Sequence, residues 1–258
     1  MIDKEVLLNT DYYKQPYQKE KDYIQELFLG GIYTKFNDLL VFKGGTALSK
    51  FYNSPRFSDD LDFSVSKKGR NEDLEKKLDG LIKSQTTYPT KTLRKLLKRG
   101  KIAYELSIRG PLFESLNKYQ HLKIEIDQNA TVFEQIKTFR RDPKYQDLIP
   151  YVAIVMDERE ILAEKVVALM FRHNLKARDL YDLYFLVRNG TEIKISLIDK
   201  KMREYGHIFT EDKFIGRLTA MQNIWKKELD RLLPESTKVD YVEARDFIIR
   251  KFKEVQLL

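Results

Sequence analysis

Residues 42–63 read Phe-Lys-Gly-Gly-Thr-Ala-Leu-Ser-Lys-Phe-Tyr-Asn-Ser-Pro-Arg-Phe-Ser-Asp-Asp-Leu-Asp-Phe and join a glycine pair to two carboxylates. The apolar run 39–42 before the glycines predicts a buried strand, and residues 46–52 predict a short helix. Gly44-Gly45 then lies at the turn between them. Glycine lets the backbone approach a ligand closely, so this turn is a candidate binding element.

The second half of this stretch predicts another strand, residues 58–65, after the break at Pro55. Side chains alternate along a strand, so Ser58, Asp60 and Asp62 should share one face. Two carboxylates held side by side repel each other unless a cation lies between them. Mg²⁺ is usually held by one or two carboxylates together with substrate phosphates. Asp60 and Asp62 are therefore candidate ligands for Mg²⁺ or Mn²⁺.

The composition narrows the class of protein. The 258 residues carry a formal charge of +8 and no cysteine, which excludes thiol catalysis, cysteine zinc sites and disulfides. The first residues lack the layout of a signal peptide, and no apolar run approaches the ~18 residues that predict a membrane span. We therefore expect a cytoplasmic protein with no membrane partner. The basic balance favours an anionic partner such as nucleic acid or nucleotide.

A second alternating segment supplies a further acid. Residues 121–127 place three apolar side chains on one face and Lys123, Glu125 and Asp127 on the other. Asp127 ends this strand on its polar face and is a candidate third metal ligand. An ordinary solvent-facing acid explains the same pattern equally well.

Residues 90–101 contain six basic side chains and no acid. Three leucines at positions 93, 96 and 97 predict a short amphipathic helix here. A solvated surface is the simpler interpretation of such a charge run. The alternative is a patch that contacts phosphates.

The chain changes character near Pro150. Before it, strand and helix patterns alternate; after a last strand at 151–155, every pattern is helical, including one long helix at 214–233. We therefore predict two domains, residues 1–150 and residues 151–258.

The helical part carries its own candidate site residues. Lys165 lies on the apolar stripe of a helix that runs from about residue 157 to 172, where it must either extend to water or meet an anion such as phosphate. In the next helix Asp179 and Asp182 share a face, and Arg178 is spaced to pair with Asp182. These acids either form a structural ion-pair set or belong to the site.

Four blocks together resemble the AbiEii-like nucleotidyltransferases, part of the DNA polymerase β-type superfamily. They are Phe42-Lys43-Gly44-Gly45-Thr46-Ala47-Leu48, Arg56-Phe57-Ser58-Asp59-Asp60-Leu61-Asp62, Glu164-Lys165-Val166-Val167-Ala168-Leu169 and Arg178-Asp179-Leu180-Tyr181-Asp182-Leu183. They occur in the family's order over about residues 23–185.

This resemblance implies an α+β fold: a mixed β-sheet flanked by helices, then a helical domain that completes the active-site cleft. It implies that Asp60 and Asp62 bind Mg²⁺ and that Lys165 contacts phosphate. Asp179 or Asp182 would complete the catalytic set, and which of them does so stays open. The nucleotide-binding residues that it implies are Lys43, Gly44, Gly45, Thr46, Ser58 and Lys165.

The implied activity is transfer of a nucleotide from NTP to RNA, with the 3′ end of tRNA as the expected acceptor. Family members are toxins of bacterial toxin–antitoxin and phage-defence systems, so a cognate antitoxin is an expected partner. Two alternatives remain open. One is nucleotidylation of a protein or a small molecule, and the other is an RNA-binding module without catalysis.

Overall fold

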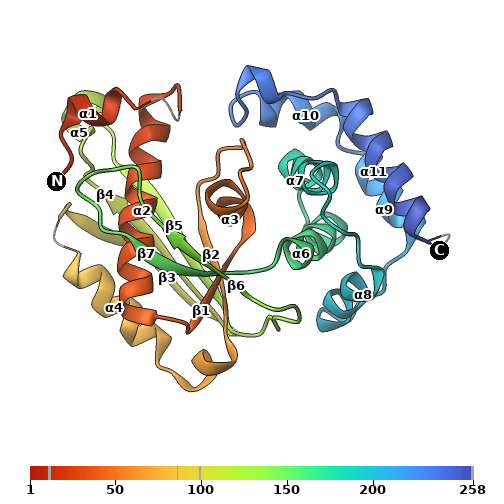
Figure 1. Cartoon of the computed structure of the whole chain (residues 1–258), viewed down its shortest axis with the longest axis horizontal. Helices are drawn as coiled ribbons and strands as arrows, with labels where there is room; N and C mark the ends of the chain where they lie inside the picture. Colours follow the sequence, from red (N-terminus) through yellow and green to blue (C-terminus); the bar gives the residue numbers. More distant parts are fainter. Residues whose placement is uncertain (11–12, 86, 99, 257–258) are drawn as a thin grey trace. The chain divides into compact units, whose positions relative to one another are not determined.

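A computed structural model describes residues 1–10, 13–85, 87–98 and 100–256 (Figure 1). The chain forms two compact units. The first contains residues 1–47, 59–132 and 136–155, and the second contains residues 48–58, 133–135 and 156–258. The short segments 48–58 and 133–135 therefore belong with the helices that follow residue 156. We describe each unit by itself.

The first unit is built on a seven-stranded mixed sheet with the order β3-β4-β5-β2-β1-β7-β6. Its neighbours are antiparallel except at β2–β5 and β1–β7, which are parallel. The strands are β1 (Leu40–Lys43), β2 (Leu61–Val65), β3 (Thr90–Lys98), β4 (Lys101–Ile108), β5 (Gln120–Asp127), β6 (Lys137–Arg141) and β7 (Tyr151–Val155). This mixed sheet with its helices confirms the predicted α+β class.

Helices cover one face of this sheet. α2 (Pro16–Phe36) contacts β5 and β7, and α4 (Leu74–Ser84) packs on α2 (Figure 1). The hydroxyl of Tyr104 on β4 donates to Asp79 of α4, so even-numbered residues of β4 point to the helices. We call this the helix face of the sheet. The unit also contains α1 (Lys4–Leu8), the 3₁₀ helix η1 (Lys67–Asn71) and α5 (Phe113–Leu116).

The basic segment 90–101 is not a helix, and that prediction is wrong. Residues Thr90–Lys98 form β3, an edge strand that pairs with β4 through a bulge between Thr92 and Arg94. Three leucines within five residues fit a helical spacing, but pairing with the long strand β4 decides the structure. Arg99, one of the six basic residues, lies outside the described part of the chain.

The central stretch forms the expected strand, helix and strand with shifted boundaries, and the glycine pair begins the helix and does not precede it. The helix of this stretch, α3 (Gly44–Phe51), follows β1 directly. The second strand, β2, starts at Leu61 and not at Ser58. Ser58 and Asp60 therefore precede the strand. Ladder pairing with β1 and β5 begins only at residue 61 or 62, which sets where the strand starts.

The second unit is helical, as predicted. The long helix predicted at 214–233 is two helices, because the chain turns at Ala220-Met221. The helices that follow residue 156 are α6 (Glu158–Phe171), α7 (Ala177–Arg188), α8 (Ile195–Glu204), α9 (Glu211–Thr219), α10 (Gln222–Leu229), η2 (Glu235–Thr237) and α11 (Tyr241–Gln256). Within the described residues, no helix combines the length and the apolar character that crossing a bilayer requires.

A buried ion network ties segment 133–135 to these helices. Glu160 on α6 is fully buried and accepts hydrogen bonds from the backbone N–H groups of Phe133 and Glu134. Lys201 on α8 is also buried and lies 2.7 Å from Glu160 and 3.2 Å from Glu164. A buried charge is tolerated only when it is paired and hydrogen-bonded, and here both conditions are met.

Candidate active site

Three charged side chains stand in one row across the centre of the sheet. The strand register pairs Lys43 of β1 with Asp62 of β2, and Asp62 with Glu125 of β5. Residues paired in this way point to the same face of a sheet, and neighbouring strands lie about 4.8 Å apart. This face is opposite to the helix face, because Glu125 alternates with Ile124, which is paired with Tyr104. We call it the acid face.

The surroundings of Asp62 disfavour its negative charge. The pKa of Asp62 is raised to about 6, first by burial and then by the negative charges of Asp60 and Glu125, against the opposing effect of Lys43 and Lys123. A carboxylate whose charge is disfavoured by two neighbouring acids is stabilised by a positive ion placed between them. Asp60 and Asp62 therefore fit a hard divalent cation that also binds substrate phosphates.

Gly44 is required by contact as well as by backbone conformation. Its φ of +78° lies in the left-handed region, and a Cβ at this position would be 2.7 Å from the Asp62 carboxylate oxygen Oδ2. Any larger residue would displace that carboxylate. Gly44, the first residue of α3, thus leaves no room for a side chain beside the acid on the neighbouring strand.

We expect Gly44→Ala to reduce transferase activity strongly and to lower the free energy of unfolding by about 1–2 kcal/mol, the cost of a left-handed alanine. Gly190→Ala is the matched control, because Gly190 has a φ of +87° and nothing within 4 Å of its added Cβ. Urea unfolding should show a loss of stability in both variants, and only Gly44→Ala should lose activity. Full activity in Gly44→Ala would contradict the contact with Asp62.

The segment that carries Asp60 is held by two helices. The Thr46 hydroxyl on α3 donates to the carbonyl oxygen of Asp60, and Gln25 on α2 donates to that of Asp59 at 3.1 Å. Burial lowers the pKa of Lys21, also on α2, while Asp59 and Asp60 act in the opposite direction. Thr46 is 1% exposed, so its hydrogen bond to the backbone of Asp60 is shielded from water.

Asp127 does not join the acid pair. It pairs with Ser64 of β2, one row away from Asp62, and its Oδ1 accepts hydrogen bonds from the backbone of Asn129 and Ala130. Among the residues that the structure describes, no three His, Cys, Asp or Glu side chains gather to hold a metal. The role of Asp127 as a third metal ligand stays a prediction. Glu125 is the acid that stands opposite Asp62.

A second cluster of charges lies in the helical unit, around Lys165. The Lys165 ammonium is 2.6 Å from Asp182 and 3.4 Å from Asp179, and its side chain is 13% exposed. Asp182 is fully buried and receives two hydrogen bonds from the Arg56 guanidinium, at 2.7 Å and 2.9 Å. Burial would raise the pKa of Asp182, but the charges of Arg56 and Lys165 outweigh it and hold the pKa below its usual value.

The two acids of α7 are both enclosed by cations. Asp179 is 1% exposed and accepts a hydrogen bond from Arg172 at 2.9 Å. The spacing that suggested an Arg178–Asp182 pair is misleading, because Arg178 instead lies 3.8 Å from Glu228. Asp179 and Asp182 thus hold Lys165 in place, and their part in the catalytic set stays a prediction.

Sequence reasoning missed Glu125 and Arg56 as members of these clusters. Glu125 stands on the predicted polar face beside Asp127, and only the strand register distinguishes the two. Arg56 is 2% exposed and pairs across 126 positions of sequence with Asp182. The one signal for Arg56 is its place in the block that ends at Asp62.

The sequence model of the AbiEii family, described as a nucleotidyl transferase toxin of a type IV toxin–antitoxin system, matches residues 28–251. The match spans both charged clusters. The chain belongs to the AbiEii family. This AbiEii protein is therefore a nucleotidyltransferase and the toxin of a type IV toxin–antitoxin system. No curated protein matches its sequence.

Solved structures support the fold of this AbiEii toxin. MenT4, a nucleotidyltransferase toxin from Mycobacterium tuberculosis H37Rv, matches with a TM-score of 0.67 and 17% identity, over 100% of this chain and 91% of MenT4. JHP933 from Helicobacter pylori matches with a TM-score of 0.51 and 18% identity, over 94% of this chain and 96% of JHP933. At such identities the likeness shows a common fold.

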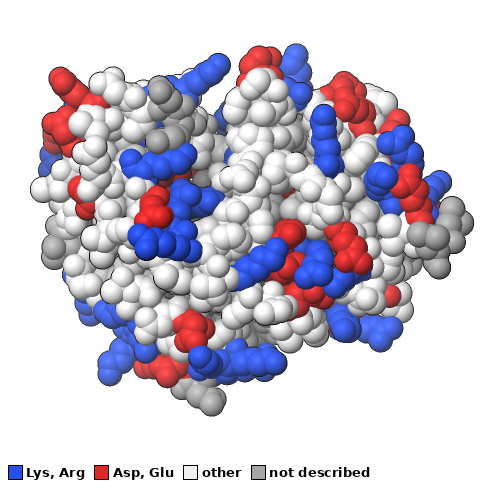
Figure 2. Space-filling model, in the orientation of Figure 1, with Lys and Arg blue, Asp and Glu red and all other residues white. Residues whose placement is uncertain are grey.

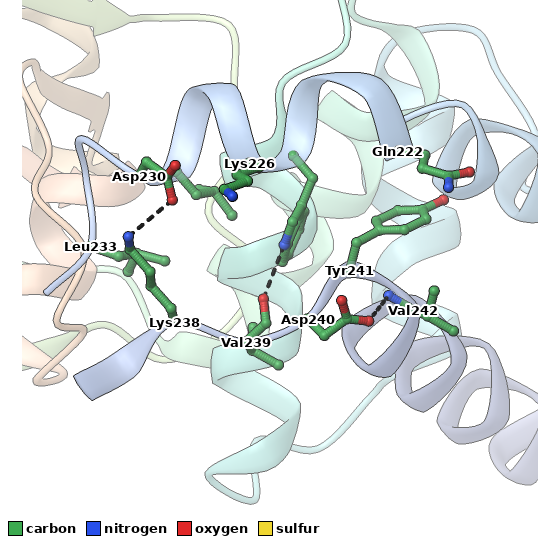
Figure 3. Close-up of a pocket in the computed structure, with 11 residues that line it drawn as sticks. Gln222, Lys226, Asp230, Leu233, Lys238, Val239, Asp240, Tyr241 and Val242 are labelled. Atoms are coloured by element: carbon green, nitrogen blue, oxygen red, sulfur yellow. Dashed lines mark hydrogen bonds and ion pairs between the residues drawn. The ribbon is translucent and has the colours of Figure 1, made fainter. Parts of the chain in front are cut away.

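The helical unit of this AbiEii toxin also contains a pocket of about 440 Å³ between α10 and the start of α11 (Figure 3). Trp225 lines it and donates its Nε1–H to the carbonyl oxygen of Val239 at 3.1 Å, and Lys238 pairs with Asp230 at 3.0 Å. These polar groups bind one another across the pocket. It contains neither of the charged clusters described above, and we assign it no catalytic role.

Proposed function

We propose that this toxin transfers a nucleoside monophosphate from an NTP to the 3′ end of an RNA, with tRNA as the acceptor and Mg²⁺ or Mn²⁺ as the cofactor. One observation carries the proposal: Asp62 stands in register with Lys43 and Glu125, against Gly44. Such a row offers carboxylates to a metal and a cation to phosphate. The basic charge of the chain supports RNA as the acceptor.

In the proposed reaction the 3′ hydroxyl oxygen of the acceptor attacks the α-phosphorus of the NTP. A new P–O bond forms, the bond to the bridging oxygen of the β-phosphate breaks, and pyrophosphate leaves with that electron pair. The hydroxyl proton passes to the carboxylate of Glu125, which is 26% exposed. A divalent ion bound by Asp60 and Asp62 would neutralise the phosphate charge and make the hydroxyl more acidic.

The remaining roles follow from charge and exposure. Lys43 and the backbone of Gly44-Gly45 bind the triphosphate, because glycines at a helix start leave N–H groups accessible to phosphate. Lys165 is the phosphate contact that we assign to the helical unit. Asp179 and Asp182 orient its ammonium and compensate its charge. Ser58, half-buried two residues before Asp60, stays a predicted nucleotide contact.

The biological setting follows from the family. A type IV toxin is expected to have a cognate antitoxin, and we propose that this toxin acts in the cytoplasm in defence against phage. Its NTP and RNA substrates are both found there. The antitoxin gene should therefore neighbour the toxin gene, which sequencing of the locus would check.

Incubation with each labelled NTP, Mg²⁺ and total tRNA tests the proposed reaction. We expect label in RNA with at least one nucleotide and loss of that label with EDTA. Label in protein with unlabelled RNA would instead show a protein acceptor, and labelled small products would show a small-molecule acceptor. RNA binding that is indifferent to Mg²⁺ and yields no label would show a binding module without catalysis.

A further inference from the structure

The acid face of the sheet continues into a basic surface. Beyond Glu125, the register places Lys123, Lys101, Arg94, Lys98 and Lys91 on the same face. In the strand register Arg94 stands opposite Glu105, and Glu105 stands opposite Lys123. In the same way Lys98 stands opposite Lys101, and Lys101 stands opposite Asp127. The strands β3, β4 and β5 therefore carry two rows, each of two basic residues and one acid, on either side of the row of Asp62.

These basic side chains are accessible. The exposed fractions of the Arg94, Lys101 and Lys123 side chains are 66%, 47% and 38%. Lys91 and Lys98 are also exposed. The surface includes one exposed acid of its own, Glu105, which is 3.9 Å from Arg94. Lys123 pairs with Glu125, and Lys101 lies near both Glu125 and Asp127. Five basic groups against these two acids and Glu105 leave a surplus of two positive charges on this face.

Charge alone would not single out this surface. Lysine, arginine and acidic side chains are interspersed over the face of the molecule in Figure 2. The distinguishing observation is position, because the register connects this basic surface to Asp62 on one face of one sheet. We infer that the acid face of β3, β4 and β5 binds the sugar-phosphate backbone of the acceptor RNA and leads its 3′ end to Asp60 and Asp62.

The geometry favours RNA over an acidic protein. β3 is three strands from β2, or about 14 Å at a spacing of about 4.8 Å. Basic groups on neighbouring strands suit a polyanion that lies across the strands with a phosphate every few ångströms. Leu96, 39% exposed in the row of Ala103 and Glu125, offers an apolar contact to a base or ribose. This inference rests on the proposed function, which supplies the acceptor.

The surface is tested directly by the fluorescence anisotropy of a labelled single-stranded RNA, titrated at salt concentrations between about 50 and 200 mM. We expect Arg94→Gln/Lys98→Gln to weaken binding about tenfold and to reduce the slope of log K against log[salt] by about one to two, because each lost phosphate contact contributes ~0.7. Lys76→Gln/Lys83→Gln is the matched control, since it removes the same charge from exposed positions of α4. This helix lies on the helix face of the sheet, where its Asp79 accepts a hydrogen bond from Tyr104.

A second control uses the same strand. Lys95 pairs with Tyr104 on the helix face, where it contacts Glu75 and Asp79 at 2.7 Å and 2.8 Å, so Lys95→Gln should leave RNA binding unchanged. Equal binding by Arg94→Gln/Lys98→Gln and the α4 control would overturn the inference. The inference would also be overturned if poly-glutamate bound as tightly as RNA and Arg94→Gln/Lys98→Gln weakened both equally. That result would point to an acidic protein as the partner.

The labelled-NTP reaction separates this inference from the proposed function. If both hold, the KM for tRNA should rise about tenfold in Arg94→Gln/Lys98→Gln, while the KM for NTP stays unchanged. Transfer to RNA with an unchanged KM for tRNA would refute the surface and leave the function standing. Salt-dependent RNA binding through this surface without any labelled RNA would refute the proposed transfer reaction alone.

Discussion

Asp62→Asn should abolish nucleotidyl transfer and at the same time raise the melting temperature of the metal-free protein. Loss of one preorganised electrostatic group typically costs about 10²–10³-fold in rate, and we expect at least that here. The stability gain follows from the raised pKa of Asp62, which is about 6 because of burial and of Asp60 and Glu125. Ionised at neutral pH, this carboxylate destabilises the fold, and a neutral amide relieves the repulsion.

Two measurements check this result. In EDTA, the variant should melt above the wild type; with Mg²⁺ added, the wild type should gain stability and the variant should gain much less. Glu75→Gln is the control, because Glu75 lies on α4 and pairs with Lys95. A variant that melts below wild type in EDTA, or that transfers nucleotide normally, would contradict the assignment of Asp62.

The nucleotidyl-transfer assay also decides between Glu125 and Asp127 as the third acid. Glu125 is in register with Asp62, whereas the Asp127 carboxylate is bound to the backbone of the loop that follows it. Glu125→Gln should therefore reduce transfer more than Asp127→Asn does. A larger loss in Asp127→Asn would restore the ligand set expected from the sequence.

Asp182→Ala should be the most destabilising substitution in the helical unit, lowering the free energy of unfolding by about 3–5 kcal/mol. Asp182 is fully buried and bonds both Arg56 and Lys165. Its removal leaves the buried Arg56 guanidinium without its bidentate partner. Urea unfolding measures the loss, and Lys251→Ala, which breaks an exposed pair with Glu254, should leave stability nearly unchanged.

The contribution of Asp182 should also depend on pH. Its pKa in the folded protein lies below the usual value, because Arg56 and Lys165 outweigh burial. A carboxyl with a depressed pKa stabilises the fold above its unfolded pKa of about 3.9, and this stabilisation disappears as pH falls through the folded value. The melting temperatures of wild type and Asp182→Asn should thus differ most above about pH 5 and converge in stronger acid. A difference that grows on acidification would contradict this sign.

Should Asp182→Ala fail to fold, Arg56→Met/Asp182→Leu tests the same interaction. Replacing a buried ion pair by apolar residues of similar size is often neutral for stability. The double variant should therefore fold better than Asp182→Ala. It should still lose transferase activity, because Lys165 would have lost the acid that orients it at 2.6 Å.

The sequence by itself determined the elements that depend on local pattern. Alternation in residues 121–127 and the apolar run at 39–42 predicted strands, and helical spacing after residue 156 predicted the helices of the second unit. Asp60, Asp62 and the glycine turn were identified in the same way, since they lie within one short stretch. Local spacing failed at β3, where strand pairing overrode the helical placement of three leucines.

Only the tertiary structure decided which distant residues meet. Register set Glu125, and not Asp127, opposite Asp62, because a shift of two residues along β5 changes the row without changing the face. Packing brought Arg56 to Asp182, a partnership that no spacing along one helix encodes. The lack of room for a Cβ at Gly44 beside Asp62 likewise depends on β1 and β2 lying next to each other. Sequence thus identified Asp60, Asp62 and Lys165 as candidates, and long-range pairing placed Glu125 opposite Asp62 and Arg56 beside Asp182.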